Sequence, residues 1–143
     1  SFQYPSDFKF YKKLIKTHQF EVNAKSSSVK GFEIGVAVDP VRIDSLDQFG
    51  SVEEVGKKVV DVELSKDGCI DAKLKSFSSN RSNGLLSYTI SYLVENTHYT
   101  SGFESKIFIA NKKLYVCTGK CKQSDLDKLS NQMNLIVGSF EVR

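Results

Sequence analysis

The sequence has no tryptophan, one methionine, two prolines and two histidines among its 143 residues. It also lacks an apolar run near the roughly 20 residues that a membrane-spanning helix needs, which excludes such a helix. No Gly-x-Ser-x-Gly nucleophile elbow, His-Glu-x-x-His zinc motif or phosphate-binding glycine loop occurs. We therefore expect a protein that acts by binding and has no catalytic centre of its own.

An excess of charge of one sign is also missing. The chain has 20 Lys and Arg against 17 Asp and Glu, a net charge of +3. Proteins that bind nucleic acids usually carry a strongly basic, clustered face, so no nucleic-acid partner is expected. One group of lysines does stand out: Lys9, Lys12, Lys13 and Lys16. It is either a solvated edge or a docking patch for an acidic protein partner.

The three cysteines are too few for a disulfide framework. Cys117 and Cys121 are separated by three residues, and Cys69 stands apart. This spacing fits neither paired zinc ligands nor a Cys-x-x-Cys redox motif. A turn at Gly119 would let Cys117 and Cys121 form a disulfide in an oxidising compartment. Two reduced thiols are the alternative, because a bridge needs Cα atoms within about 7 Å.

One histidine is a candidate metal ligand. His98 lies three residues after Glu95, at the end of a predicted strand or in the loop beyond it. Imidazole and carboxylate groups bind metals, but no further ligands occur at metal-site spacing. A solvated loop histidine is the alternative.

Alternating apolar residues predict most of the chain to be antiparallel strands. Between Gly31 and Asp39, for example, Phe32, Ile34, Val36 and Val38 alternate with smaller or polar residues, and Pro40 ends the strand. Polar turns are predicted at 26–28, 80–84 and 111–112. The predicted strands are 20–24, 31–39, 70–78, 85–95, 102–110 and 113–118. The aromatic N-terminal segment is expected to fold across the sheet as core cover; its aromatic residues are Phe2, Tyr4, Phe8, Phe10 and Tyr11.

Two helices are predicted from capping boxes and apolar residues at helical spacing. The first starts at Ser51 with Glu54, ends near Ser65 and carries Val52, Val55, Val59 and Val62. The second starts at Ser124 with Asp127 and carries Leu126, Leu129, Met133, Ile136, Val137 and Phe140. Packing on the inward face of the sheet is predicted for Val52, Val55, Val59, Leu126, Leu129, Met133 and Ile136. The predicted fold class is α+β, a central antiparallel β-sheet flanked by helices, in a single domain over residues 1–143.

Several landmarks, taken in order, resemble the PsbP family of lumenal extrinsic photosystem proteins. The most specific is the Phe-Gly-Ser-x-Glu-Glu element that opens the first predicted helix. The landmarks are Tyr4–Phe8, Val36–Pro40, Asp47–Val55, Lys113–Tyr115 and Ser139–Val142. Two positions depart from the family pattern: Phe8 stands where tryptophan is frequent, and Gly102 where plant-type members carry a histidine. These departures favour a divergent, PsbP-like member.

The resemblance implies a function as well as a fold. It implies an α/β sandwich docked on the lumenal side of a photosystem, photosystem II first, as a non-catalytic subunit peripheral to the thylakoid membrane of a chloroplast. Its partners would be the photosystem core and other extrinsic subunits. It would stabilise the oxygen-evolving complex and its retention of calcium and chloride, with calcium bound through the assembly.

Two other functional hypotheses stay open. Relatives in the family resemble assembly or repair factors for photosystem II or photosystem I, and such a factor could bind a metal through His98. The third hypothesis is a small enzyme with a pocket that cannot be recognised in the sequence.

Overall fold

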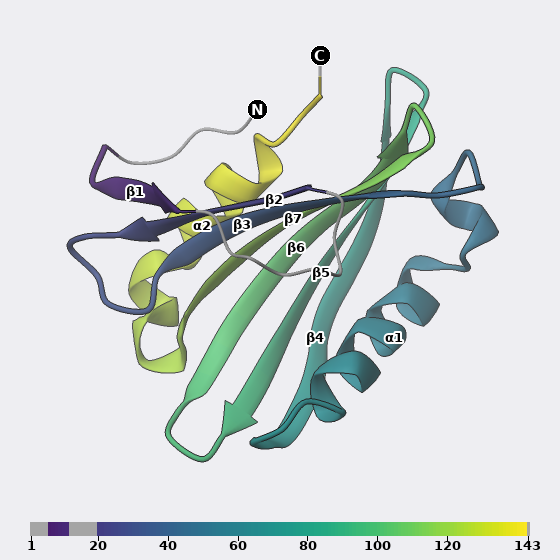
Figure 1. The fold of residues 1–143 in the computed structure, drawn as a ribbon. Helices are drawn as coiled ribbons and strands as arrows, with labels where there is room; N and C mark the ends of the chain where they lie inside the picture. Colours follow the sequence, from purple (N-terminus) through teal and green to yellow (C-terminus); the bar gives the residue numbers. More distant parts are fainter. Residues whose placement is uncertain (1–5, 12–19, 143) are drawn as a thin grey trace.

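The structure, a computed structural model, describes residues 6–11 and 20–142 (Figure 1). These residues form a seven-stranded antiparallel sheet and two α-helices, as the α+β prediction states. The strand order is β1-β2-β3-β7-β6-β5-β4. The strands are β1 (Phe8–Tyr11), β2 (Phe20–Ser26), β3 (Glu33–Pro40), β4 (Cys69–Ser82), β5 (Leu85–Asn96), β6 (Thr100–Ala110) and β7 (Lys113–Lys122).

Two of the hairpins use two-residue turns in which both residues have positive φ. Asn83 (53°) and Gly84 (80°) join β4 to β5, and Asn111 (53°) and Lys112 (57°) join β6 to β7. Such turns match the twist of the paired strands, and Asn-Gly is their favoured sequence. The turn predicted at 80–84 is present but shorter, because β4 continues to Ser82 and only Asn83 and Gly84 form the turn. The turn predicted at 111–112 is confirmed.

Strand β7 also runs past its predicted end at residue 118. Gly119 lies inside the strand, in register with Ile34 of β3 and Glu104 of β6. A Cβ at this position would lie 2.6 Å from Met133 Cγ, so glycine here allows a helix to approach the sheet. The predicted turn at Gly119 is wrong, because this glycine serves helix packing.

The helices α1 (Val52–Leu64) and α2 (Leu126–Gly138) pack on opposite faces of the sheet (Figure 1). Consecutive residues of β6 demonstrate this. Ile107 belongs to the core cluster that Val60 of α1 joins, while Phe108 belongs to the cluster under α2. A single inward face for both helices is thus a wrong prediction, since each helix has a core of its own. Neither described helix is long and apolar enough to cross a membrane.

Helix α2 packs on β6 and β7, and the core cluster beneath it extends to β3. Its buried residues are Leu129, Met133, Ile136 and Val137, and Phe140 is buried just beyond its end. Burial of each such side chain contributes about 1.5–3 kcal/mol. The predicted Ser124 cap is wrong, because a 3₁₀ turn (Gln123–Asp125) precedes α2 and the helix begins at Leu126.

Helix α1 begins as predicted, but its most deeply buried residues are not the predicted valines. The Ser51–Glu54 capping box is present, with Glu54 N donating to Ser51 Oγ at 3.2 Å. The buried residues, however, are Gly56 and Val60. A Cβ on Gly56 would lie 3.0 Å from Leu74 Cδ1, so this glycine sets the close approach. Val52, Val55 and Val59 are half-buried and pack against the core cluster on this face, as predicted, whereas Val62 is 58% exposed.

The aromatic N-terminal segment contributes the edge strand β1. Phe8 is buried and meets the Phe32 ring edge-on at 5.0 Å between centroids. Core cover is therefore confirmed for Phe8, in a strand that pairs with β2. Phe2 and Tyr4 lie outside the described residues.

Candidate functional site

The element that most resembles a family motif, Phe49–Glu54, is held by the backbone conformation of Gly50 and by two hydrogen bonds to its carbonyls. Gly50 has φ of +135°, which disfavours other residues. Its carbonyl accepts a hydrogen bond from Tyr88 Oη of β5 at 2.8 Å, and the Phe49 carbonyl accepts one from Lys58 Nζ at 3.2 Å. This motif therefore anchors α1 to the sheet, which is a structural role.

Asp7, in the first landmark, also has a structural role. Its carboxylate accepts hydrogen bonds from Ser26 Oγ at 2.8 Å, from the Ser28 backbone N–H at 3.3 Å and from Ser28 Oγ. The hydroxyl bonds of Ser28 and Ser26 hold the pKa of Asp7 below its usual value. The charged carboxylate thus ties the segment before β1 to the turn between β2 and β3.

Of the four lysines predicted as a docking patch, only Lys9 lies in the described residues. It is exposed in β1, in register with Lys25 of β2. Lysine on an edge strand discourages pairing with another chain, which gives Lys9 a structural explanation as well. Lys12, Lys13 and Lys16 lie outside the described residues. The docking patch stays a prediction.

His98 and Glu95 are both exposed near the β5–β6 turn. The backbone N–H of His98 donates to Asn96 Oδ1 at 2.8 Å, so Asn96 shapes this turn. Within residues 6–11 and 20–142, no group of three or more His, Cys, Asp or Glu side chains could hold a metal ion. The described residues therefore offer no donor set that fits the calcium implied by the resemblance.

The two cysteines of β7 are free thiols. Cys117 and Cys121 lie four residues apart in one extended strand, a separation of about 13 Å. A disulfide needs Cα atoms within about 7 Å, so of the two alternatives the structure agrees with the reduced thiols. Both side chains are buried under α2, and burial raises the pKa of Cys117 to about 12 and that of Cys121 to about 11. Neither thiol is poised for redox chemistry.

A groove made of two cavities lies on the α1 side of the sheet. Its polar part, here the polar cavity, has a volume of about 470 Å³. The cavity lies between the strands and the C-terminal end of α1. Its lining includes Glu21, Asn23, Glu63, Ser101, Phe103 and Lys120.

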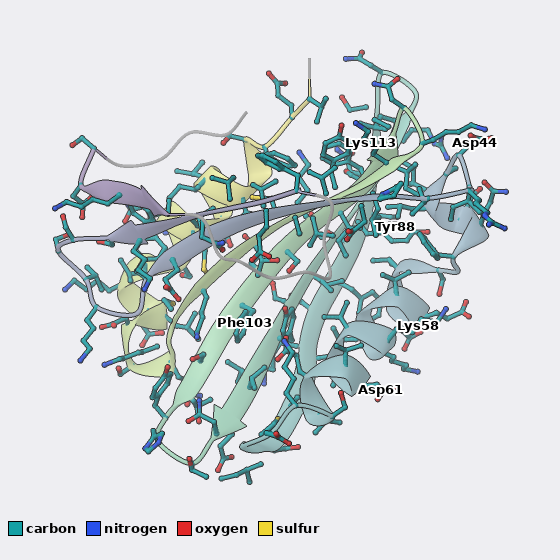
Figure 2. The ribbon with its side chains drawn as sticks, viewed as in Figure 1. Asp44, Lys58, Asp61, Tyr88, Phe103 and Lys113 are labelled. Atoms are coloured by element: carbon teal, nitrogen blue, oxygen red, sulfur yellow. The ribbon has the colours of Figure 1, made fainter. Side chains whose placement is uncertain are left out.

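The second part, here the apolar cavity, has a volume of about 420 Å³. Its lining includes Val55, Val59, Val62, Ile107, Leu114 and Val116. The two cavities adjoin, since Glu63 and Thr118 line both. In Figure 2, Phe103 on β6 marks the polar cavity and Lys58 on α1 marks the apolar one.

Sequence reasoning missed this groove. The valine stripe of α1 packs on the core as predicted, but helical spacing does not reveal that Val55, Val59 and Val62 also line a cavity. The polar lining gave no signal, since Glu21 and Ser101 come from strands far apart in the sequence. Only the strand order brings them to one face.

Comparisons with known proteins agree with the fold and the landmarks. The family model described as PsbP matches residues 1–142. The PsbP domain-containing protein 2, chloroplastic, of Arabidopsis thaliana is 36% identical over 86 residues. That match covers 58% of this chain and 36% of the relative, so it spans little more than a third of the relative's own length.

Solved structures extend the likeness to nearly the whole chain. The solution structure of cyanobacterial PsbP (CyanoP) from Synechocystis sp. PCC 6803 superposes with a TM-score of 0.85 at 16% identity, covering 99% of this chain and 85% of that one. PA94 of Pseudomonas aeruginosa, a protein of unknown function, has a TM-score of 0.60 at 10% identity, covering 96% and 99%. These two likenesses concern the fold. Because the family model matches almost every residue, the chain belongs to the PsbP family.

Proposed function

We propose that this domain is a non-catalytic, extrinsic protein that docks on the lumenal side of a photosystem, photosystem II in the first place. The observation that carries the proposal is the match of the PsbP family model to residues 1–142. The chloroplastic relative supports a chloroplast setting, and within it we propose the thylakoid lumen. The partners would be the photosystem core and its other extrinsic subunits.

A role in binding, without catalysis, follows from what the landmarks do. Asp7 and Tyr88 make contacts that hold the fold together, as does the Ser51 cap. A scaffold held in this way presents surfaces for docking. Because the described residues offer no metal donor set, the domain would help to retain calcium and chloride by covering the oxygen-evolving complex, without ligating the ions.

Capture from solubilised thylakoids tests the proposal. The tagged protein is expressed in its source organism, membranes are dissolved in mild detergent, and the captured complexes are quantified by mass spectrometry. We expect complete photosystem II at near-equal stoichiometry. Membranes stripped of the protein should also need more calcium and chloride for oxygen evolution. Capture of no photosystem subunit would contradict the proposal.

The docking patch is tested in the same system. Replacing its lysines by glutamine should weaken rebinding to stripped membranes, because ionic contacts at an interface rim set orientation and on-rate. Moderate salt should release the parent protein, since the Debye length is about 8 Å at physiological ionic strength. The matched control removes the same four charges from exposed sites elsewhere: Lys75, Lys112, Lys113 and Lys128. Equal rebinding of the two variants would assign Lys9, Lys12, Lys13 and Lys16 to a solvated edge.

An assembly or repair factor for photosystem II or photosystem I is the second candidate. One observation favours it: the curated relative is named for its PsbP domain and not for a photosystem subunit. Such a factor would be captured below equal stoichiometry and with incomplete complexes. The same experiment therefore separates the two candidates.

A further inference from the structure

The polar cavity contains two buried oxygen atoms without a hydrogen-bond partner among the described residues. They are Glu21 Oε2 and Ser101 Oγ. Ser101 is only 3% exposed, and both residues line the polar cavity. The other oxygen of Glu21 accepts a hydrogen bond from Asn23 Nδ2 at 3.2 Å. Because unsatisfied buried polar groups are rare and costly, this carboxylate is a ready acceptor for a donor that enters the cavity.

The charges around this oxygen favour a cation. Glu63 and Asp67 line the polar cavity together with Glu21. Of the two lysines in the lining, Lys66 pairs with Glu63 at 2.9 Å, and Lys120 Nζ lies over the Tyr99 and Phe103 rings at 5.9 and 5.7 Å. Neither of these contacts reaches the free oxygen of Glu21.

The end of α1 adds to this field. A helix C-terminus carries partial negative charge, and the last turn of α1 contains no basic residue. Glu63, in that turn, lines both cavities. The negative helix end and the carboxylates therefore act in the same direction, and a positive group in the polar cavity would be stabilised by both.

The adjoining apolar cavity needs an apolar occupant. It is lined by half-buried Val55 and Val59 and by Val62, which is 58% exposed. Phe49 stands at the same cavity with 39% of its surface exposed. Val55 and Val59 pack partly on the core, and Val62 stays exposed at the cavity. Burial of apolar surface here would favour binding.

We propose that this groove binds a segment of a protein partner in which a lysine or arginine side chain stands beside large apolar side chains. The cationic group donates to Glu21 Oε2 in the polar cavity, and its apolar neighbours pack on the valines of α1. Lys and Arg fit because they carry donors and no acceptor. The shortage of metal-ligand groups in the described chain argues against a bare metal ion.

This inference goes beyond docking through lysines. The groove is acidic and apolar where the lysine patch is basic, so the two surfaces would take different partner segments. It does not depend on which photosystem, if any, the protein docks on. Failure of one proposal therefore leaves the other standing.

The test uses the whole chain and two defined probes. The first is the capped peptide acetyl-Leu-Val-Arg-Leu-amide, and the second carries uncharged citrulline in place of arginine. Titration is followed by amide chemical shifts in ¹⁵N-labelled protein. We expect shifts to gather at α1 and at the groove faces of β6 and β7, with the arginine peptide binding at least about tenfold tighter than the citrulline peptide.

Two variants with matched controls locate the effect. In Glu21→Gln the preference for arginine over citrulline should fall to about one, whereas Glu53→Gln, on the exposed first turn of α1, should keep it. Val62→Ser should weaken both peptides alike and leave the preference intact. Leu135→Ser, which alters a 74% exposed leucine on α2, should change neither.

Four results would overturn the inference. They are absence of binding, shifts centred away from the groove, equal affinity of the parent for the two peptides, and an unchanged preference in Glu21→Gln. If another part of this chain fills the groove, neither peptide will bind. The comparison of the two peptides on the parent protein holds even if a variant fails to fold.

Discussion

Lys106 joins the sheet to the end of α2. Its side chain stands on the α2 face of β6, and Nζ donates to the carbonyls of Gly138 at 3.0 Å and Phe140 at 2.9 Å. The final carbonyls of a helix have no partners within the helix and carry partial negative charge. Lys106 satisfies the carbonyl of Gly138, the last residue of α2, and that of Phe140, two residues beyond the helix end. Lys106→Met removes the ammonium group and keeps an unbranched chain of similar length.

The expected loss follows from these two contacts. Hydrogen bonds to charged groups contribute about 1.5–3 kcal/mol when well shielded, and one of the two bonds here is exposed. Solvent screening therefore places the pair near the lower bound, and we expect the free energy of unfolding to fall by about 1–2 kcal/mol. At about 3 °C per kcal/mol for a chain of this size, Tm should fall by about 3–6 °C.

Urea denaturation and calorimetry measure the change. The matched control is Lys75→Met, which removes an exposed lysine from β4 on the same sheet. We expect Lys75→Met to change the free energy of unfolding by less than about 0.5 kcal/mol. If Lys106→Met and Lys75→Met unfold alike, the two bonds at the end of α2 contribute nothing measurable and the argument is refuted.

Three further predictions concern the thiols, the anchor of α1 and the packing under α2. Iodoacetamide at neutral pH should label Cys69 first in the folded protein, because burial raises the pKa of Cys117 to about 12. After unfolding without reductant, all three thiols should be labelled. Labelling of a single thiol would reveal a disulfide between the other two. Tyr88→Phe should lower the free energy of unfolding by about 1 kcal/mol in urea melts, since it removes one hydrogen bond; no change would refute the anchor. Gly119→Ala should cost about 1–3 kcal/mol by crowding Met133, and adding Met133→Ala should make the Gly119→Ala step nearly neutral in calorimetry.

Local patterns were sufficient for most of the secondary structure. Alternation in β3 and β5 predicted the strands within a few residues, because both strands bury one set of side chains more deeply than the other. The Ser51–Glu54 pair predicted the start of α1, because a capping box is made by residues three apart. Such signals are readable in one sequence since every partner is a near neighbour along the chain.

Other features depend on partners that are distant in the sequence. Gly119 reads as a turn residue, yet it lies inside β7 because Met133 of α2 needs the space. Gly56 likewise gives no periodic signal, although its contact with Leu74 fixes the rotation of α1. The disulfide alternative for Cys117 and Cys121 depended on the same turn at Gly119, which β7 does not make. The candidate groove was not predicted for the same reason, because strand order brings together lining residues that are distant in the sequence.

The arrangement of the helices explains why a groove exists on this fold. Helix α2 packs across β6 and β7, whereas α1 contacts β4 and β5. On the α1 side, the faces of β3 and β7 lie beyond these main contacts. Leu114 and Val116 of β7 line the apolar cavity there, and Gly35, Thr118 and Lys120 line the polar one. The same two strands turn Val36 and Cys117 to the opposite face, where α2 buries them. A strand pair with one face buried under α2 and the other only partly covered by α1 has a surface left for a partner. We expect the peptide titration to detect binding at this surface.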